Sequence, residues 1–223
     1  GRYDPTVGTA MVANGYDRDY PLLAGDDRPG SHGPAPVPAP GCREVVLDAD
    51  RRLVLVPPGA LLDVGAMAKG LAADLVSDEL MASGAEGVVV NIGGDLRVRG
   101  TGPDSGRWPI RIEDLRHPCR ELLNVAVSDC GVASSSVRRR RWRHGGRARH
   151  HLVDPRTGCP ADTVLAGVTT IASEAWWAEV VATDILLDPD PAIAIRSRVD
   201  VAAIGIEPDG TLHLSPSFET LVA

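Results

Sequence analysis

The order of apolar patterns along the chain constrains its fold most strongly. Short runs typical of β-strands, joined by glycine-marked turns, fill most of the sequence. Only two long stretches have helical spacing: one carries Met67, Leu71, Leu75 and Leu80, and the other covers residues 174–187. Hairpins mixed with two principal helices predict an α+β fold with mixed or antiparallel sheets, and not a doubly wound parallel sheet.

The expected strands pair around recognisable turns. Residues 42–56 predict a hairpin with a polar turn, and residues 87–100 predict two strands around Gly93-Gly94. Further hairpins are expected around Gly145-Gly146 and around residues 208–210. The other expected elements are a short helix and turn in residues 1–24 and β segments at 108–112, 122–127, 132–137 and 164–171.

At 223 residues and 43% hydrophobic content, the chain can bury a core as one domain or as two closely packed lobes. Residues 25–40 are rich in proline and glycine and predict a mobile surface loop. No apolar run has the roughly 18 residues of a membrane helix, and no signal-peptide pattern opens the chain. Because it begins at Gly1, we leave the compartment open between cytoplasmic and, if an upstream signal was removed, membrane-associated or exported.

The charge distribution argues against a general nucleic-acid binder. The formal net charge is −7, whereas such binders present a broad basic face. Positive charge gathers locally in residues 138–149, where a solvated hairpin is favoured over a cradle for phosphate. The four cysteines, Cys42, Cys119, Cys130 and Cys159, form no C-x-x-C pair. We expect reduced, buried structural thiols, with one disulfide as the alternative in an exported protein.

The only lysine of the chain lies at an expected strand-to-helix junction. Lys69 stands among 22 arginines, within the segment Asp63-Val-Gly-Ala-Met-Ala-Lys-Gly70. Glycines at such a junction let the backbone approach a ligand, and exposed N–H groups at a helix start favour phosphate oxygens. The segment lacks the P-loop order, which excludes an ordinary nucleoside triphosphatase. Taken alone, Asp63 is better explained as a helix N-cap.

Two more polar, glycine-marked segments follow in the same manner. Asn91-Ile-Gly-Gly-Asp95 comes after an apolar run, although Gly93-Gly94 alone would be a tight turn. In His151-Leu-Val-Asp-Pro-Arg-Thr-Gly158, a rigid turn can present imidazole and hydroxyl groups to a polar ligand, with a purely structural turn as the alternative. Three such junctions suggest one composite site for an anion.

The second expected helix offers oxygen ligands on one face. Glu179 and Thr183 are separated by one helical turn. A carboxylate and a hydroxyl suit Mg²⁺, which prefers oxygen ligands and commonly shares them with substrate phosphates. An ordinary helix glutamate is the alternative.

Taken together, these segments resemble a known family. The segments 1–8, 63–70, 91–95, 151–158 and 178–183 occur in the order seen in FAD:protein FMN transferases, the ApbE family. The resemblance runs from Gly1 to about Leu187. It implies a T-fold-related α+β architecture, forming one flavin transferase domain over residues 1–223 without the family's N-terminal portion. It also implies binding of FAD and Mg²⁺ and transfer of FMN to a threonine of an acceptor flavoprotein, with release of AMP.

The resemblance also implies roles for individual positions. Tyr3 and Asp4 match a flavin-contacting turn, and Asp63, Lys69 and the backbone of Val153 match FAD contacts. The predicted cofactor-binding set is completed by Gly93, Gly94, Asp95, Asp154 and Thr157. The predicted metal ligands are the Ala66 carbonyl, Glu179, where the family has aspartate, and Thr183. The predicted catalytic residues are His151 and Thr183.

One departure from the family pattern bears on the metal. Ala182 stands where some members have another carboxylate, so water or Asp184 would have to supply that oxygen. Two alternative functions follow: an FAD diphosphatase giving FMN and AMP, and a flavin-binding protein without turnover.

Overall fold

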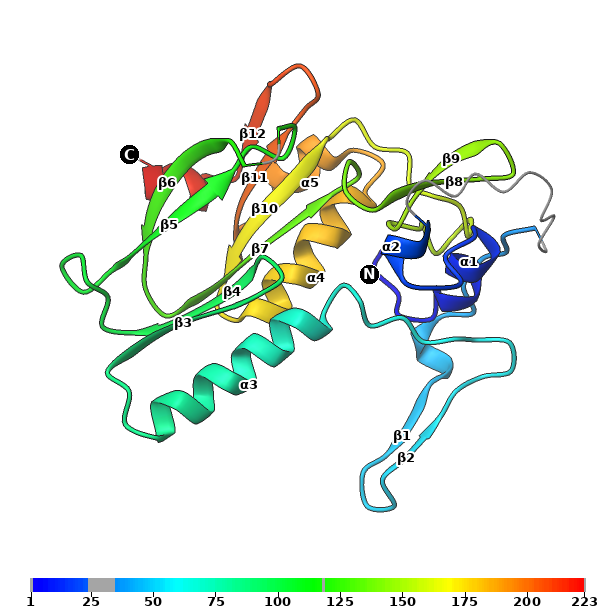
Figure 1. Cartoon of the computed structure of the whole chain (residues 1–223), viewed down its shortest axis with the longest axis horizontal. Coiled ribbons are helices and arrows are strands. Elements are labelled where there is room, and N and C mark those ends of the chain that lie inside the picture. The colour runs from blue at the N-terminus through cyan, green and yellow to red at the C-terminus, as the bar shows by residue number, and fades with distance from the viewer. Residues whose placement is uncertain (1, 24–34, 118, 223) are drawn as a thin grey trace. The chain divides into compact units, whose positions relative to one another are not determined.

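The computed structural model describes residues 2–23, 35–117 and 119–222 (Figure 1). The chain divides into two compact units, one formed by residues 1–64 and 137–162 and the other by residues 65–136 and 163–223. The single domain expected over residues 1–223 stays a prediction. Most of the mobile loop expected at 25–40 lies outside the described residues, and residues 35–40 contain neither helix nor strand.

The first unit combines short helices with two small hairpins. Its core joins Trp142 to Ala10 and Met11, and the Trp142 indole donates a 2.8 Å hydrogen bond to the Asn14 carbonyl. The aromatic ring therefore anchors the second hairpin to the first helix. The elements are α1 (Gly8–Ala13), α2 (Tyr20–Leu23), the 3-10 helix η1 (Cys42–Glu44), β1 (Val46–Asp48), β2 (Leu53–Leu55), β8 (Arg141–His144) and β9 (Arg147–His150).

The second unit is built on a six-stranded antiparallel sheet in the order β12-β11-β10-β7-β4-β3. Its remaining strands, β5 and β6, pair with each other in a separate ribbon. The elements are α3 (Ala68–Ala82), β3 (Gly87–Ile92), β4 (Asp95–Gly100), β5 (Trp108–Glu113), β6 (Glu121–Val127), β7 (Cys130–Ser136), β10 (Gly167–Ala172), α4 (Ala175–Leu186), α5 (Pro191–Arg196), β11 (Ala202–Ile206), β12 (Leu212–Leu214) and α6 (Pro216–Val222).

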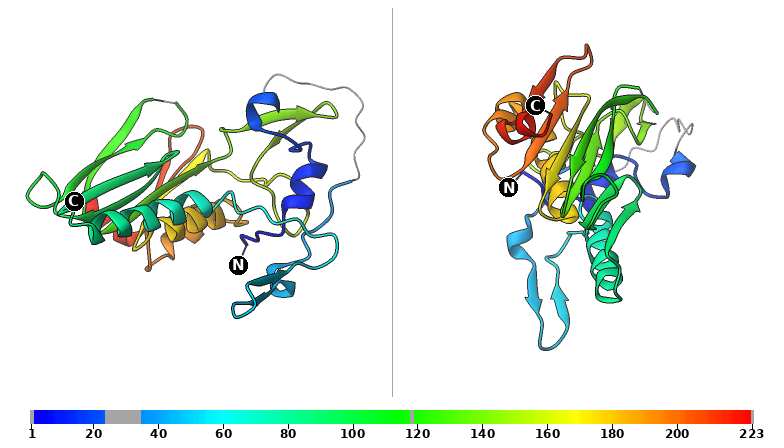
Figure 2. Two further views of the ribbon diagram at one scale, coloured as in Figure 1. Left: turned by 60° about the horizontal axis from the view of Figure 1, so that its bottom comes forward. Right: turned by 90° about the vertical axis from the view of Figure 1, so that its left-hand side faces the viewer.

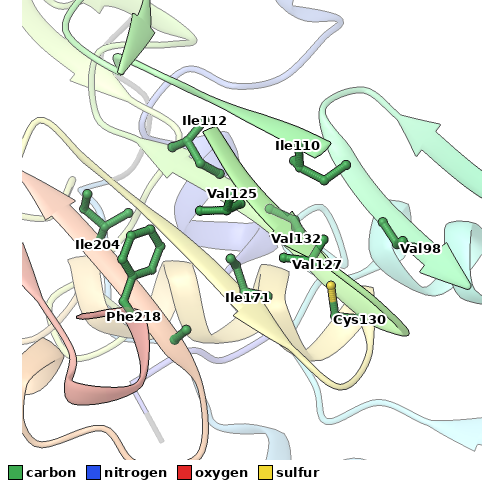
Figure 3. Close-up of a cluster of buried hydrophobic side chains, with 11 residues drawn as sticks. Val98, Ile110, Ile112, Val125, Val127, Cys130, Val132, Ile171, Ile204 and Phe218 are labelled. Carbon is green, nitrogen blue, oxygen red and sulfur yellow. The ribbon is translucent and has the colours of Figure 1, made fainter. Parts of the chain in front are cut away.

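The large sheet lies between two helices and the β5–β6 ribbon. Helices α3 and α4 run along one face, and the ribbon covers the other (Figure 2). Alternating side chains explain this layering, because Ile110 and Ile112 from β5 and Val125 and Val127 from β6 all point into one cluster (Figure 3). Phe218 of α6 is fully buried in the same cluster.

The expected fold class is confirmed. The described residues form an α+β structure with antiparallel sheets, in which α3 and α4 are the two longest helices. The four expected hairpins correspond to β1–β2, β3–β4, β8–β9 and β11–β12. The short helices α5 and α6 were not predicted; each begins with a proline at its first position, and Asp190 caps α5. None of the helices in the described residues combines the length and apolar character needed to cross a membrane.

Helix α3 faces the opposite way from the one its apolar stripe suggests. Leu71, Leu75 and Leu80 are 41%, 61% and 43% exposed. The residues buried in their place are Gly70, Ala73, Asp74 and Ser77. A regular apolar stripe usually marks the buried face of a helix, but in α3 the stripe faces outward. Contact with α4 requires small side chains and one carboxylate on the inner face instead.

The expected N-cap is also wrong. Helix α3 begins after Met67, which occupies the N-cap without a side-chain hydrogen bond. Asp63 belongs to the first unit, where its backbone N–H donates to the Pro5 carbonyl at 2.7 Å. At the other end, Gly84 follows the helix with φ 97°, a conformation typical of a glycine that ends a helix.

All four cysteines are free thiols, so the expected reduced state agrees with the structure. Only Cys130 is buried, whereas the other three are exposed, which corrects the expectation of buried thiols. Burial raises the pKa of the Cys130 thiol to about 11.

Candidate functional site

The start of α3 approaches the start of α4 unusually closely. A Cβ atom on Gly70 would lie 2.5 Å from backbone atoms of Ala175 and Trp176. On the other side, a Cβ on Gly131 of β7 would lie 2.2 Å from the Ala175 nitrogen. Glycine is therefore required at both positions, since real Cβ atoms do not approach backbone this closely.

A buried carboxylate on α3 caps α4. Asp74 accepts hydrogen bonds of 3.0 Å from the backbone N–H groups of Ala175 and Trp176. It also pairs with Arg97 of β4 at 3.2 Å. The N-cap residue Glu174 makes no side-chain cap, so a residue 100 positions away in the chain satisfies the exposed N–H groups of α4. This arrangement fixes the orientation of the helix that carries Glu179 and Thr183.

Three of the sequence segments meet at one ammonium group. The Lys69 Nζ donates a hydrogen bond to Glu179 Oε1 and lies 2.9 Å from Asp95 Oδ2. The other Glu179 oxygen accepts a 2.9 Å hydrogen bond from the Gly70 backbone N–H. Both acidic side chains are only 4% exposed, whereas Lys69 is 32% exposed. The predicted residues Lys69, Asp95 and Glu179 thus form one cluster, which we call the lysine–carboxylate cluster.

The lysine–carboxylate cluster holds two carboxylates and one ammonium group. Burial raises the pKa of Glu179, and repulsion from Asp95 raises it further. Lys69 and the hydrogen bond from the Gly70 N–H lower the pKa, but they do not outweigh the other two effects. Burial lowers the pKa of Lys69, but Asp95 and Glu179 outweigh that effect and raise it. Both shifts favour the protonated form of the group concerned.

The Gly93-Gly94 turn gives the lysine its space. A Cβ on Gly93 would lie 3.3 Å from Lys69 Cδ, and both glycines have positive φ, 63° and 101°. The Gly94 N–H donates to the Asn91 side chain at 2.9 Å, which closes the turn. The turn is therefore structural and also shapes the surroundings of the lysine.

Thr183 lies one helical turn beyond Glu179 and is buried. Its hydroxyl oxygen is 3.2 Å from that of Ser135 on β7. Sequence reasoning missed Ser135, because a run of three serines in a strand has no spacing that distinguishes one of them. The pair adds two neutral oxygen atoms to the α4 face that carries the lysine–carboxylate cluster.

The residues fit a divalent cation in their chemistry, but they do not form a complete cage. Among the described residues, no group of three or more His, Cys, Asp or Glu side chains is arranged to hold a metal ion. However, Asp95 and Glu179 carry one more negative charge than Lys69 compensates, and their oxygens suit a hard cation. Glu179 and Thr183, one helical turn apart on α4, could hold such an ion, which would draw further ligands from water or substrate; the Ala66 carbonyl stays a predicted ligand.

In the first unit, Tyr3 and Asp4 lie in a turn closed by side-chain bonds. Asp4 accepts from the Thr6 hydroxyl at 2.6 Å and from the Cys42 N–H at 3.0 Å. The Tyr3 hydroxyl is 3.5 Å from the Asp63 carbonyl. Asp4 thus ties the first segment to Cys42, and Tyr3 lies beside the predicted Asp63.

The His151–Gly158 segment forms a second tight turn in the first unit. Asp154 pairs with Arg156 at 2.8 Å, and this contact lowers the pKa of its carboxyl. The Thr157 hydroxyl accepts from the Cys159 N–H at 3.1 Å, and Val153 is buried. These partners give Asp154 and Thr157 structural roles in the turn. His151 follows β9 directly and is half-buried.

The predicted site residues therefore fall into two sets, each assembled within its own unit. The second unit brings together Lys69, Gly93, Asp95 and Glu179, with Gly94 in the same turn, Thr183 one turn along α4 and Ala66 just before α3. The first unit contains Tyr3, Asp4, Asp63, His151, Val153, Asp154 and Thr157.

Comparison with known proteins identifies relatives over most of the chain. A FAD:protein FMN transferase from Klebsiella pneumoniae (strain 342) is 30% identical over 177 residues, covering 78% of this chain and 54% of that protein. One from Treponema pallidum is 30% identical over 182 residues, covering 77% and 50%. The chain thus spans about half the length of these curated relatives.

Solved structures agree with the sequence comparison. The ApbE protein of Thermotoga maritima has a TM-score of 0.82 at 25% identity, covering 99% of this chain and 72% of that one. The flavinyl transferase ApbE of Pseudomonas stutzeri has a TM-score of 0.77 at 26% identity, covering 99% and 69%. The sequence model of the ApbE family matches residues 1–204, and the chain belongs to that family.

Proposed function

We propose that this protein is an FAD:protein FMN transferase, which moves FMN from FAD to a threonine hydroxyl of an acceptor flavoprotein and releases AMP. Family membership supports the proposal, because several relatives bear that name. The observation that carries it is the lysine–carboxylate cluster, in which three separate sequence segments meet at Lys69.

The proposed task of the cluster is to bind and orient the diphosphate of FAD. Lys69 is the only lysine, and its partly exposed ammonium can bind phosphate oxygens as a point charge. The close contact of α3 with α4 at Gly70 fixes the backbone around it. A cationic group held beside the diphosphate stabilises negative charge on the departing phosphate.

Magnesium dependence is part of the proposal. When bound, Mg²⁺ would neutralise charge on the diphosphate as the anhydride bond breaks. Glu179 and Thr183 would hold it from one face of α4, together with the Ala66 carbonyl. Asp95 adds negative charge beside them, and the Ser135 hydroxyl lies against Thr183.

In the proposed transfer step, the acceptor threonine oxygen displaces AMP at phosphorus. The acceptor threonine oxygen forms a bond to the phosphorus of the FMN half, and the anhydride P–O bond breaks with its electron pair leaving on AMP. We assign His151 to take the threonine proton on an imidazole nitrogen, since imidazole titrates near neutral pH. The acceptor then carries FMN as a phosphate ester.

The test is incubation of the chain with FAD, Mg²⁺ and an acceptor that bears a threonine. We expect in-gel flavin fluorescence after denaturation. The mass of the acceptor should increase by the mass of FMN less one water. The variants His151→Ala and Thr183→Val should lose transfer while keeping the wild-type unfolding midpoint. The matched control Thr220→Val removes an exposed hydroxyl on α6 and should transfer normally.

Other products would reject the proposal in distinct ways. Free FMN and AMP without a labelled acceptor would make the protein an FAD diphosphatase. Intact FAD in the presence of Mg²⁺ and a competent acceptor would make it a flavin-binding protein without turnover.

A further inference from the structure

Glu179, one of the two candidate metal ligands on α4, is already bound by a cation of the protein itself. Both oxygens of Glu179 have donors, Oε1 from Lys69 and Oε2 from the Gly70 N–H. The carboxylate is buried, so water does not readily replace either donor. A metal ion that used Glu179 would therefore have to displace a partner that the fold holds in place.

We propose that Lys69 competes with the divalent cation for Glu179, so that the nucleotide and the metal bind cooperatively. This inference rests on the proposed function, because it assumes that the same cluster receives FAD and the metal. Lys69 thus has a second role besides binding phosphate. It keeps the affinity of the site for the metal low until a diphosphate binds.

Lys69 and the metal compete because both are positively charged and both need the same carboxylate. An ammonium and a divalent ion at the same carboxylate oxygen repel each other strongly in a site shielded from water. Lys69 can move, because its side chain is 32% exposed and the partner of its Nζ besides the two carboxylates, the Gly65 carbonyl at 3.2 Å, lies one turn back along the chain. Glu179 cannot follow it, because the helix that carries it is capped by Asp74 and packed at Gly70.

A bound diphosphate would relieve this competition. Its oxygens offer Lys69 an alternative anion, which frees Glu179 Oε1 for the metal. Without the metal, the departure of Lys69 would leave a buried carboxylate that only the Gly70 N–H compensates, which is costly. Each ligand therefore removes an obstacle to the other, and the coupling must be reciprocal.

The decisive measurement is titration calorimetry with Mg²⁺ alone, on wild type and on Lys69→Met. If Lys69 competes, the variant binds Mg²⁺ about tenfold or more tightly in the absence of nucleotide, within the usual range of coupling between sites. Adding FAD should tighten Mg²⁺ binding to the wild type by a larger factor than it tightens binding to the variant. Unchanged or weaker Mg²⁺ binding by the variant would overturn the inference.

Two further variants keep the test decisive. Glu179→Asp retains the charge but shortens the side chain, which moves the carboxylate away from Lys69. This variant should therefore also bind Mg²⁺ more tightly in the absence of nucleotide. It replaces Lys69→Met as the deciding variant if Lys69→Met does not fold. Arg99→Met removes a positive charge that pairs with Asp78 in the same unit. It should leave Mg²⁺ affinity unchanged, which separates competition at Glu179 from a general change in charge.

The result can be read separately from the proposed function. FMN transfer by the wild type, together with unaltered Mg²⁺ affinity in Lys69→Met, would reject the competition alone. Absence of both Mg²⁺ binding and transfer in the wild type would reject the proposed function, and the inference with it.

Discussion

The two long helices of the second unit lie on the same face of one sheet, and both bury small and polar side chains, but only α4 also buries large aliphatic ones. Helix α4 buries aliphatic residues such as Val181, Ile185 and Leu186, which are at most 1% exposed. Helix α3 buries glycine, alanine, serine and aspartate, and exposes its leucines. The comparison shows that contact distance and polar partners, rather than hydrophobicity, determine the inner face of α3.

Replacing Asp74 by alanine should have the largest effect on this comparison. It would remove the cap of α4 and leave the buried Arg97 without its carboxylate, at a cost of about 3–5 kcal/mol in the free energy of unfolding. Urea unfolding of the variant measures this loss. The matched control Asp78→Ala breaks an exposed ion pair with Arg99 and should cost about 0–1 kcal/mol. Equal losses in the two variants would mean that α3 is not held by its buried carboxylate.

A leucine-to-alanine substitution on each helix tests directly which face of the helix is buried. Leu186→Ala on α4 should cost about 2–5 kcal/mol, because the side chain is fully buried and its removal leaves a cavity. Leu75→Ala on α3 is its matched partner, and the two unfolding free energies can be measured side by side. A large loss at Leu75 would contradict the outward orientation of α3.

Gly70→Ala tests the close approach of the helices. The added methyl group would meet the α4 backbone, which cannot yield as a flexible side chain can, so we expect a loss of about 1–3 kcal/mol or more in unfolding free energy. Thermal unfolding should show a lower midpoint. Leu71→Ala, one position along the same helix, is the control and should change stability by less than about 0.5 kcal/mol.

The smallest effect is expected at the outer face itself. Leu75→Ala should alter the free energy of unfolding by about 0.5 kcal/mol or less, since the leucine is 61% exposed and alanine favours helix. Denaturant titration against wild type provides the measurement. Destabilisation beyond about 2 kcal/mol would show that the stripe is covered in solution.

Sequence patterns predicted the parts of the fold that local chemistry decides. The Gly93-Gly94 turn and the strands beside it were recognisable, because positive φ values demand glycine there. Helix α4 was equally clear, because its apolar residues face a core. The orientation of α3 was not predictable, since it depends on Asp74 reaching N–H groups some 100 residues later in the chain.

The candidate site was predictable to a similar extent. Motif order indicated Lys69, Asp95 and Glu179 as separate candidates, and the structure joins them. Spacing could not reveal that Glu179 has Lys69 and Gly70 as partners, because ion pairing between distant segments leaves no local pattern. Ser135 and Arg97 were missed for the same reason, since their partners Thr183 and Asp74 come from other elements.

A chain with one lysine side chain contains its own chemical reporter. Acylating reagents attack only the unprotonated amine, and the two acids around Lys69 raise its pKa and keep the proton on. The rate at which this single side chain is labelled, followed by mass spectrometry of its peptide, therefore records how firmly its carboxylate partners hold it at any moment.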